Sequence, residues 1–218
     1  MSCRVVVLIS GSGSNLQALI EQLDSPTEIV GVIANRPQAY GLQRATVAGI
    51  ANECLDHQGF ISREAFDQAL AERIDSYQPD LVVLAGFMRI LTPELVRRYH
   101  GRMLNIHPSL LPKYKGLHTH QRALDAGDAE HGATIHFVTE ELDGGPLVVQ
   151  GRVKVLADDS AEALAARVQL IEHRLYPLAV SWFAQGRLRL ASQGAELDGE
   201  LIASGGLRME DYPQTSEA

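Results

Sequence analysis

Short apolar runs alternate with amphipathic segments through the first half of the chain. The runs at 5–9, 29–33, 81–85 and 103–106 carry no charge, which is typical of strands buried inside a parallel sheet. Between the runs, apolar side chains recur at helical spacing, first at Leu16, Leu19, Ile20 and Leu23 and again at Phe66, Leu70, Ile74 and Tyr77. Each set covers one face of a helix, and a short helix is expected at 45–48.

The second of those helices carries sequence signals at both ends. Ser62 is expected to cap its N-terminus, and Pro79 to stop it.

The pattern changes after residue 107, where three breakers, Pro108, Pro112 and Gly116, mark a long loop. A short helix is expected at 121–126. Strands are expected at 133–138 and 147–155, joined by a turn at Asp143-Gly144. Gln150, Arg152 and Lys154 alternate with valines in the second strand, so we expect one face of that strand to be solvated.

A long helix follows the last strand. Asp159 and Glu162 have the spacing of a capping box, so the helix is expected to begin near Asp159. Pro177 should kink it, because a proline ring removes the hydrogen bond to the carbonyl of His173. Gly186 should end it.

Strands that alternate with helices predict an α/β fold with a doubly wound, mostly parallel sheet (Rossmann-like) and an antiparallel C-terminal edge. No stretch rich in proline, glycine and serine separates two cores. We therefore expect one domain over residues 1–218, made of a first half at 1–100, a second half at 101–190 and a C-terminal extension at 191–218.

Composition narrows the choice of partners and compartment. The 218 residues carry 19 Lys and Arg against 27 Asp and Glu, a formal net charge of −8. Binding to nucleic acid or to a membrane surface would need a basic stripe, so we expect neither partner, and an anionic ligand must be held locally. No apolar run approaches the ~20 residues of a membrane span. Cys3 and Cys54 have no disulfide or metal-ligand spacing, which favours a reducing cytoplasm.

The first candidate site is the Gly-Ser-Gly-Ser-Asn loop at residues 11–15, between the first strand and its helix. Glycines allow a ligand to approach the backbone, and free N–H groups at a helix start favour an anion. A dinucleotide fingerprint is excluded, because Leu16 stands in place of a third glycine and Asn35 in place of the acidic residue. Two interpretations stay level: a site for a single phosphate, and a tight turn capped by Ser14 or Asn15.

The second candidate is the pair Asn105 and His107 at the end of a predicted strand. Residues two apart on a strand share a face, and an amide and an imidazolium aimed at one point could stabilise an oxyanion. The alternative is a structural histidine beside a loop proline. Asp143 is either a turn residue or a carboxylate that faces His107 and relays protons.

Two further signals are weaker. His118 and His120 could suggest a metal site, but no cysteine or acidic residue stands at a diagnostic spacing, so no metal is expected. The segment 85–91 places Arg89 among apolar residues, either as a surface arginine beside the core or as part of an apolar wall for a flat ligand.

A family resemblance rests on the segments at 10–17, 85–91, 105–112 and 141–146, which occur in this order. Together they closely resemble the phosphoribosylglycinamide formyltransferases, folate-dependent enzymes of purine biosynthesis, from Val5 to about Trp182. The Asn-x-His and Asp-Gly motifs alone are shared with methionyl-tRNA formyltransferases and formyltetrahydrofolate deformylases. Those relatives carry an additional domain, and we expect neither domain here.

The resemblance implies that a formyl group passes from 10-formyltetrahydrofolate, as cosubstrate, to the amine of 5'-phosphoribosylglycinamide, without a metal. The implied catalytic residues are Asn105, His107 and Asp143. The implied substrate-binding residues are Gly13, Ser14, Asn15, Gln169 and Glu172. The implied folate-binding residues are Arg63, Met88, Arg89, Ile90, Leu91, Thr139, Glu140, Glu141 and Leu142, together with Asn105 and Asp143. The first half of the chain would then bind the phosphate, and the second half would carry catalysis and the folate.

In this chemistry Asn105 and a protonated His107 would stabilise the formyl oxygen, and Asp143 would keep His107 charged. The chain departs from the family pattern at two positions. Ser12 stands where asparagine is also seen, and Lys115 replaces a common proline before Gly116. The second change lies in the loop Pro112–His120 and could alter it, so we assign no role to His118 and His120.

Two other functions stay open at this point. A formyltetrahydrofolate hydrolase would use the same residues with water as the nucleophile. A non-enzymatic module would bind a phosphorylated ligand at the glycine loop but no folate. A monomer and a homodimer are equally compatible with the sequence.

Overall fold

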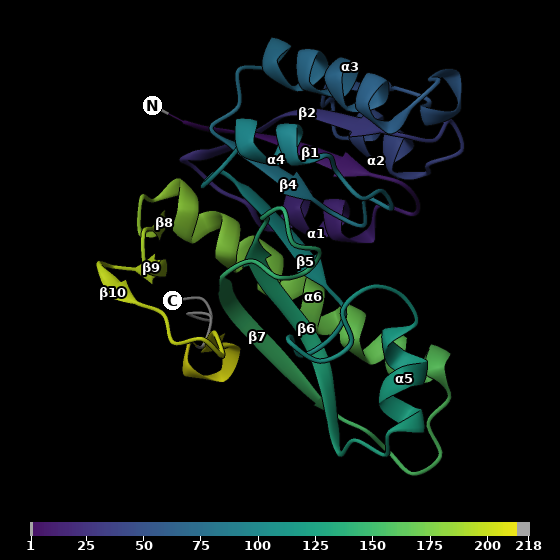
Figure 1. Ribbon diagram of the computed structural model, residues 1–218, viewed down its shortest axis with the longest axis vertical. Coiled ribbons are helices and arrows are strands. Elements are labelled where there is room, and N and C mark those ends of the chain that lie inside the picture. The colour runs from purple at the N-terminus through teal and green to yellow at the C-terminus, as the bar shows by residue number, and fades with distance from the viewer. Residues whose placement is uncertain (1, 213–218) are drawn as a thin grey trace.

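A central sheet organises the computed structural model, which describes residues 2–212 (Figure 1). Its eight strands run in the order β11-β7-β6-β5-β4-β1-β2-β3. The first-half strands are β1 (Cys3–Ile9), β2 (Thr27–Ala34), β3 (Asn52–Cys54), β4 (Leu81–Leu84) and β5 (Met103–His107), all parallel. β6 (Glu130–Phe137) and β7 (Leu147–Lys154) pair antiparallel, and β11 (Leu207–Arg208) lies parallel to β7. The predicted α/β class and antiparallel edge are confirmed.

Helices cover both faces of this sheet. In β1, Val5, Val7 and Ile9 point into a cluster shared with helices α1 (Ser14–Gln22), α2 (Gly41–Val47) and α6 (Ala161–Ala184). Val6 and Leu8 point to the other face, into a cluster with α3 (Arg63–Ser76) and α4 (Pro93–Arg98). Burial on both faces explains why β1 is a continuous apolar run. The remaining helices are α5 (Thr119–Asp125) and the 3-10 turns His57–Gly59 and Met209–Asp211.

β7 is solvated on only part of the face that was expected to be solvated. Gln150 is buried, and its Nε2 atom donates to the carbonyl of Leu111 at 2.8 Å and to the hydroxyl of Thr134 at 3.1 Å. Only Lys154 is fully exposed, while Arg152 is half-buried. The loop that follows β5 covers this part of the strand, so a polar side chain there is buried and satisfied rather than solvated.

The start of α6 lies one residue beyond the predicted cap. Ser160, not Asp159, is the N-cap, and its hydroxyl accepts a hydrogen bond from the amide of Ala163 at 3.2 Å. The Asp159 carboxylate accepts from the amide of Leu156 at 2.8 Å instead. Either side chain can cap a helix, and the sequence spacing selected the wrong one.

Pro177 lies inside α6, which continues to Ala184. The carbonyl of His173, which a proline at 177 leaves without its helical partner, accepts a hydrogen bond from Nε2 of Gln22 at 3.1 Å. Gln22 belongs to α1, which packs beside α6. A side chain of the neighbouring helix therefore satisfies the backbone group that the proline frees.

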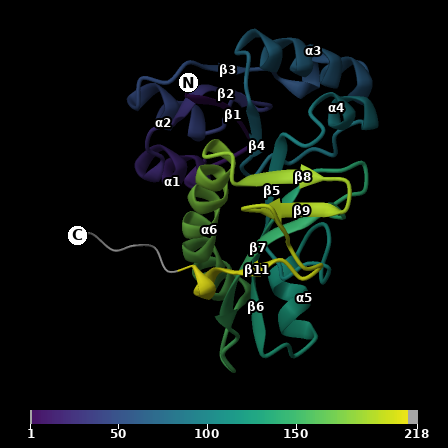
Figure 2. The same cartoon turned by 90° about the vertical axis from the view of Figure 1, so that its left-hand side faces the viewer.

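Several elements have no counterpart in the sequence-based prediction. These are β3, α4, β11 and a separate antiparallel sheet of β8 (Leu188–Ala191), β9 (Gly194–Leu197) and β10 (Glu200–Leu201). Figure 2 shows β8 and β9 beside the C-terminal end of α6. Of the expected extension at 191–218, residues 213–218 lie outside the described part. Across residues 2–212, no helix has the length and apolar character needed to cross a membrane.

Candidate active site

The carboxyl end of β5 carries the predicted pair Asn105 and His107. Asn105 lies opposite His136 of β6, and His107 lies opposite Thr134. His107 is buried and Asn105 half-buried. Because they are two residues apart on one strand, both side chains project from the same face of the sheet.

Asp143 lies beside His107, as the functional interpretation of its turn requires. The Nδ1 atom of His107 is 3.4 Å from Oδ2 of Asp143, and the Nε2 atom is 2.8 Å from the carbonyl oxygen of Tyr114. The same Oδ2 atom accepts a hydrogen bond from the amide of Gly116 at 2.8 Å. Both ring nitrogens therefore face acceptors, and an imidazolium, which has two N–H donors, matches this environment.

His136 is a buried partner of Asn105 that the sequence did not reveal. Its Nδ1 atom is 2.9 Å from the carbonyl oxygen of Phe137, so Nδ1 carries the proton. Its Nε2 atom, 3.0 Å from Nδ2 of Asn105, then accepts a hydrogen bond from that amide. Burial holds the pKa of His136 below its ordinary value, which keeps the ring neutral. This contact fixes which end of the Asn105 amide faces His136.

A polar network supports the loop that carries Tyr114 and Gly116. The hydroxyl of Thr134 donates to the carbonyl of Ser109 at 2.6 Å and accepts from the amide of Leu111 at 3.1 Å. The Ser109 hydroxyl in turn donates to the carbonyl of Lys113 at 2.6 Å. These buried contacts tie the loop to β6, so the partners of His107 and Asp143 are held by the sheet itself.

Backbone strain gathers around the same loop. Tyr114 has a φ of 56°, His118 of 58° and Asp143 of 49°. Left-handed backbone is costly for residues other than glycine and tends to occur at functional sites. The strain supports the interpretation of this region as the catalytic centre.

The glycine loop at 11–15 leads into α1 without a side-chain cap. Gly13 has a φ of 70°, no side chain caps the first turn, and no acidic residue lies in it. The hydroxyl of Ser14 accepts a hydrogen bond from Nε2 of Gln169 at 3.0 Å. The first amides of α1 therefore remain available to an anion, so the alternative of a turn capped by Ser14 or Asn15 is not what the structure shows.

Asn15 connects this loop to α6. Its Nδ2 atom donates to Oε2 of Glu172 at 2.8 Å, while its buried Oδ1 atom has no partner among the described residues. Burial raises the pKa of Glu172, and the hydrogen bond from Asn15 opposes the shift. The residues implied as substrate-binding, Gly13, Ser14, Asn15, Gln169 and Glu172, are thus brought together from α1 and α6.

A second group of predicted site residues lies at 88–91, a segment that we call the 88–91 wall. Its side chains alternate between exposed and enclosed, with Met88 and Ile90 exposed and the Nε atom of Arg89 buried. The Arg89 guanidinium lies over the ring of Phe66, 4.6 Å from the centroid. The segment therefore presents two apolar side chains to solvent and holds Arg89 against Phe66.

Buried Asp67 anchors the end of that wall. Its Oδ2 atom accepts a hydrogen bond from the amide of Thr92 at 2.6 Å. Burial raises the pKa of Asp67, while the hydrogen bonds from Thr92 and the charges of Arg89 and Arg63 oppose the shift. Arg63 itself is exposed at the start of α3, so its charge acts on Asp67 from the solvent side.

Ion pairs hold the loop at 139–142. Nη1 of Arg97 is 2.8 Å from Oε1 of Glu140, and Nζ of Lys115 is 2.7 Å from Oε1 of Glu141. Leu142 is exposed next to them. Lys115, the departure from the family pattern, therefore joins the loop after β5 to the loop before Asp143.

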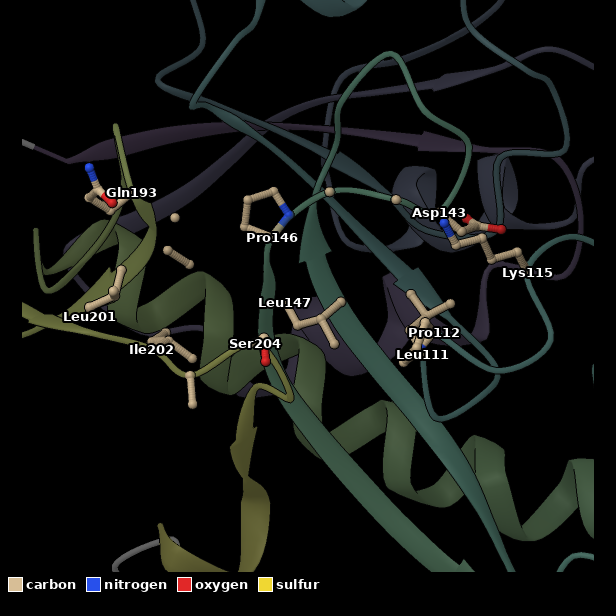
Figure 3. Close-up of a pocket in the computed structure, with 15 residues that line it drawn as sticks. Leu111, Pro112, Lys115, Asp143, Pro146, Leu147, Gln193, Leu201, Ile202 and Ser204 are labelled. Carbon is tan, nitrogen blue, oxygen red and sulfur yellow. The ribbon is translucent and has the colours of Figure 1, made fainter.

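A cavity of about 510 Å³ lies behind Asp143, between the turn at 143–147 and the C-terminal segments at 193–195 and 201–204. Figure 3 shows Asp143 and Lys115 at one end and Gln193 and Leu201 at the other. Asp143 is the only predicted site residue that lines it. Neither the 88–91 wall nor the glycine loop at 11–15 lines this cavity.

The residues that sequence reasoning missed are His136, Tyr114, Asp67 and Arg97. His136 left a weak signal, as a histidine within a mostly apolar strand, whereas the roles of the others depend on tertiary contacts. Among residues 2–212, no group of three His, Cys, Asp or Glu side chains is placed to hold a metal. His118 occupies the N-cap position of α5 without a side-chain hydrogen bond to the helix, and Nδ1 of His120 is 3.2 Å from Nε2 of His131.

An amide, an imidazole and a carboxylate lie near the end of a central strand, and such a set of groups suits a group-transfer enzyme whose reaction passes through an oxyanion. Residues 3–180 match the model of the formyl transferase family. The chain belongs to the formyl transferase family.

Relatives within the family are similar over nearly the whole chain. The chain is 54% identical over 211 residues to phosphoribosylglycinamide formyltransferase of Escherichia coli (strain K12), covering 95% of this chain and 99% of that one. The Haemophilus influenzae protein of the same name is 47% identical over 210 residues, covering 95% and 99%. The structure of phosphoribosylglycinamide formyltransferase from Coxiella burnetii, in complex with CHES, superimposes with a TM-score of 0.91 at 50% identity, covering 95% and 99%.

Proposed function

We propose that the chain transfers the formyl group of 10-formyltetrahydrofolate to the amine of 5'-phosphoribosylglycinamide in purine biosynthesis. The products are formylglycinamide ribonucleotide and tetrahydrofolate. The observation that carries the proposal is the contact between His107 and Asp143 beside Asn105, in a chain 54% identical to a phosphoribosylglycinamide formyltransferase. Both substrates are small molecules.

The reaction forms one C–N bond and breaks another. The neutral amine of the ribonucleotide attacks the formyl carbon, and negative charge develops on the formyl oxygen. Asn105 and protonated His107 donate hydrogen bonds to that oxygen; one donor of this kind is worth about 10²–10³ in rate. Because Nδ1 of His107 faces Asp143, the donor to the formyl oxygen is the Nε2–H group, which exchanges the Tyr114 carbonyl for the substrate.

Proton transfer completes the exchange. The attacking nitrogen loses a proton and the departing folate nitrogen gains one. Asp143 assists this transfer, directly or through a water molecule, and stabilises the imidazolium of His107. General acid–base assistance contributes about 10²–10⁴ in rate.

Both halves of the chain contribute to each substrate site. In the first half, the amides of Gly13, Ser14 and Asn15 bind the phosphate, while Gln169 and Glu172 reach from α6 to the ribose or glycinamide end. The folate lies against Arg63, Met88, Arg89, Ile90, Leu91, Thr139, Glu140, Glu141 and Leu142. The wall at 88–91 and its anchor at Asp67 support this placement.

We place the enzyme in the cytoplasm and its catalytic unit in a single domain. Cys3 and Cys54 are both free thiols, which suits a reducing compartment. One sheet carries both substrate sites, which supports a single domain.

An omission assay tests the proposal. The protein is incubated with 10-formyltetrahydrofolate and 5'-phosphoribosylglycinamide, and deformylated folate is followed while each substrate is left out in turn. We expect turnover only when both are present. Turnover without the ribonucleotide would identify a hydrolase. A calorimetric titration with a folate analogue is the second measurement, and if it shows no binding, the protein is a phosphoryl-binding module instead.

A further inference from the structure

Helix α2 packs end-on against the glycine loop and binds two consecutive carbonyls of it. The amide of Gly41 donates to the carbonyl of Gly11 at 3.1 Å. The Nε atom of Arg44 donates to the carbonyl of Ser12 at 2.9 Å. Both carbonyl oxygens therefore point towards α2.

The direction of these carbonyls sets the direction of the amides that follow them. In a trans peptide the C=O and N–H groups point to opposite sides. The N–H groups of Ser12 and Gly13 therefore point away from α2. They extend the set of free amides at the start of α1, and consecutive N–H groups of this kind form an anion-binding concavity.

The contact between α2 and the loop is as close as backbones allow. A Cβ atom on Gly13 would lie 2.6 Å from the Cα atom of Gly41, and Gly13 has a φ of +70°. Glycine at both positions lets the two segments touch. The same hypothetical Cβ would lie 3.5 Å from Cδ of Arg44, so the arginine side chain runs alongside the loop.

Arg44 is itself held in place on two sides. Its Nη1 atom donates to Oε1 of Gln17 on α1 at 3.1 Å, and its guanidinium lies 5.0 Å from the centroid of the Tyr40 ring. Arg44 therefore links α2, the loop and α1 through one planar group. A guanidinium can make these two hydrogen bonds at once, whereas a lysine ammonium lacks the fixed fork.

We propose that Arg44 is a positioning residue for the substrate phosphate: it orients the Ser12–Gly13 peptide so that its N–H group faces the ligand. The inference rests on the proposed function of the loop. The guanidinium also adds positive charge next to the loop, in a chain with a net charge of −8.

The test compares two substrates in two proteins. Wild type and Arg44→Met are assayed with 5'-phosphoribosylglycinamide and with the same compound lacking its phosphate. We expect Arg44→Met to raise KM for the phosphorylated substrate about tenfold, with kcat and the KM for the folate within about twofold. The dephosphorylated substrate should behave alike in both proteins. Equal losses with both substrates would show general damage to the site and overturn the proposal.

Two further variants sharpen the result. Arg44→Lys should recover part of the affinity, because one donor can reach the Ser12 carbonyl without reaching Gln17. Arg73→Met removes the same charge from an exposed position on α3 and should behave as wild type. If Arg44→Lys has the wild-type KM for the phosphorylated substrate, the positive charge alone accounts for the effect of Arg44. That result would overturn the positioning role.

The outcomes also separate this inference from the function on which it rests. If wild type binds the two substrates equally, the loop does not bind the phosphate. The inference about Arg44 and the proposed phosphate-binding role of the loop then both fail. If wild type prefers the phosphorylated substrate and Arg44→Met keeps the whole preference, only the role of Arg44 fails. Urea unfolding of each variant checks that the fold is retained.

Discussion

Nδ2 of Asn105 lies 3.0 Å from Nε2 of His136. Because His136 is neutral with its proton on Nδ1, the Asn105 amide is the donor and its orientation is fixed. One N–H of Asn105 is used by His136, which leaves the second for the formyl oxygen. In the proposed reaction, the hydrogen bond from Asn105 to the formyl oxygen would therefore depend on His136, which does not touch the reacting atoms.

Replacing His136 should therefore impair the chemical step. His136→Phe removes the acceptor that orients Asn105, and we expect kcat to fall about tenfold or more with little change in either KM. His136→Gln can still accept a hydrogen bond and should retain more activity. Steady-state kinetics of both variants check this, and an unchanged kcat in His136→Phe would refute the orienting role.

The pair His107 and Asp143 should be indispensable for turnover but not for folate binding. His107→Ala and Asp143→Asn each remove one part of the charge-stabilising unit, so we expect kcat to fall by about 10²–10⁴. The left-handed backbone at residue 143 also suits asparagine, which makes Asp143→Asn a mild structural change. Kinetics combined with titration of a folate analogue measure both effects. Near-normal turnover in either variant would exclude the assignment.

Buried His131 should make the protein less stable in mild acid. Burial, followed by the neighbouring charge of His120, lowers the pKa of His131 to about 4, from 6.5 in an unperturbed histidine. A lowered folded-state pKa means that the unfolded chain takes up the proton first. The contribution of this group to stability is present above pH 6.5 and is lost as the pH falls towards 4.

The variant His131→Gln cannot titrate and isolates this effect. In urea unfolding between pH 7.5 and 4.5, wild type should lose more free energy of unfolding than His131→Gln does. Parallel pH profiles for the two proteins would contradict the prediction.

The contact of Gln22 with the carbonyl of His173 should matter only because Pro177 is present. Gln22→Met removes the donor, and we expect a loss of about 1 kcal/mol in the free energy of unfolding. In a Pro177→Ala background the new amide at 177 can bind that carbonyl, so the same change should cost much less. A double-mutant cycle measures this coupling, and equal costs in both backgrounds would disprove it.

Periodicity predicted the parts of the fold whose side chains are uniformly buried. β1, β4 and the long helices follow directly from their apolar patterns, because burial on both faces of a strand or on one face of a helix dictates them. β3 and β8–β11 are short and partly exposed, so the pattern held no signal for them. Gln150 was misplaced for a related reason, since alternation cannot tell which face of a strand a later loop will cover.

The candidate site shows the same limit. The spacing of Asn105 and His107 on one strand was enough to place them together, and the Asp-Gly turn made Asp143 a candidate partner of His107, but with a turn residue as the alternative. The contacts of His107 with Tyr114 and of Asp143 with Gly116 depend on a loop held by Thr134 and Gln150. The contacts of Asp143 and Gln150 join segments far apart along the chain, and no local pattern encodes them.

The most direct test of the account follows the formyl group itself. The protein is given 10-formyltetrahydrofolate labelled with ¹³C at the formyl carbon, together with 5'-phosphoribosylglycinamide, and the products are resolved by NMR. The account predicts that the label appears in formylglycinamide ribonucleotide in step with tetrahydrofolate formation, and that Asp143→Asn slows this transfer by about 10²–10⁴. Label released as formate, at a rate independent of the ribonucleotide, would contradict it.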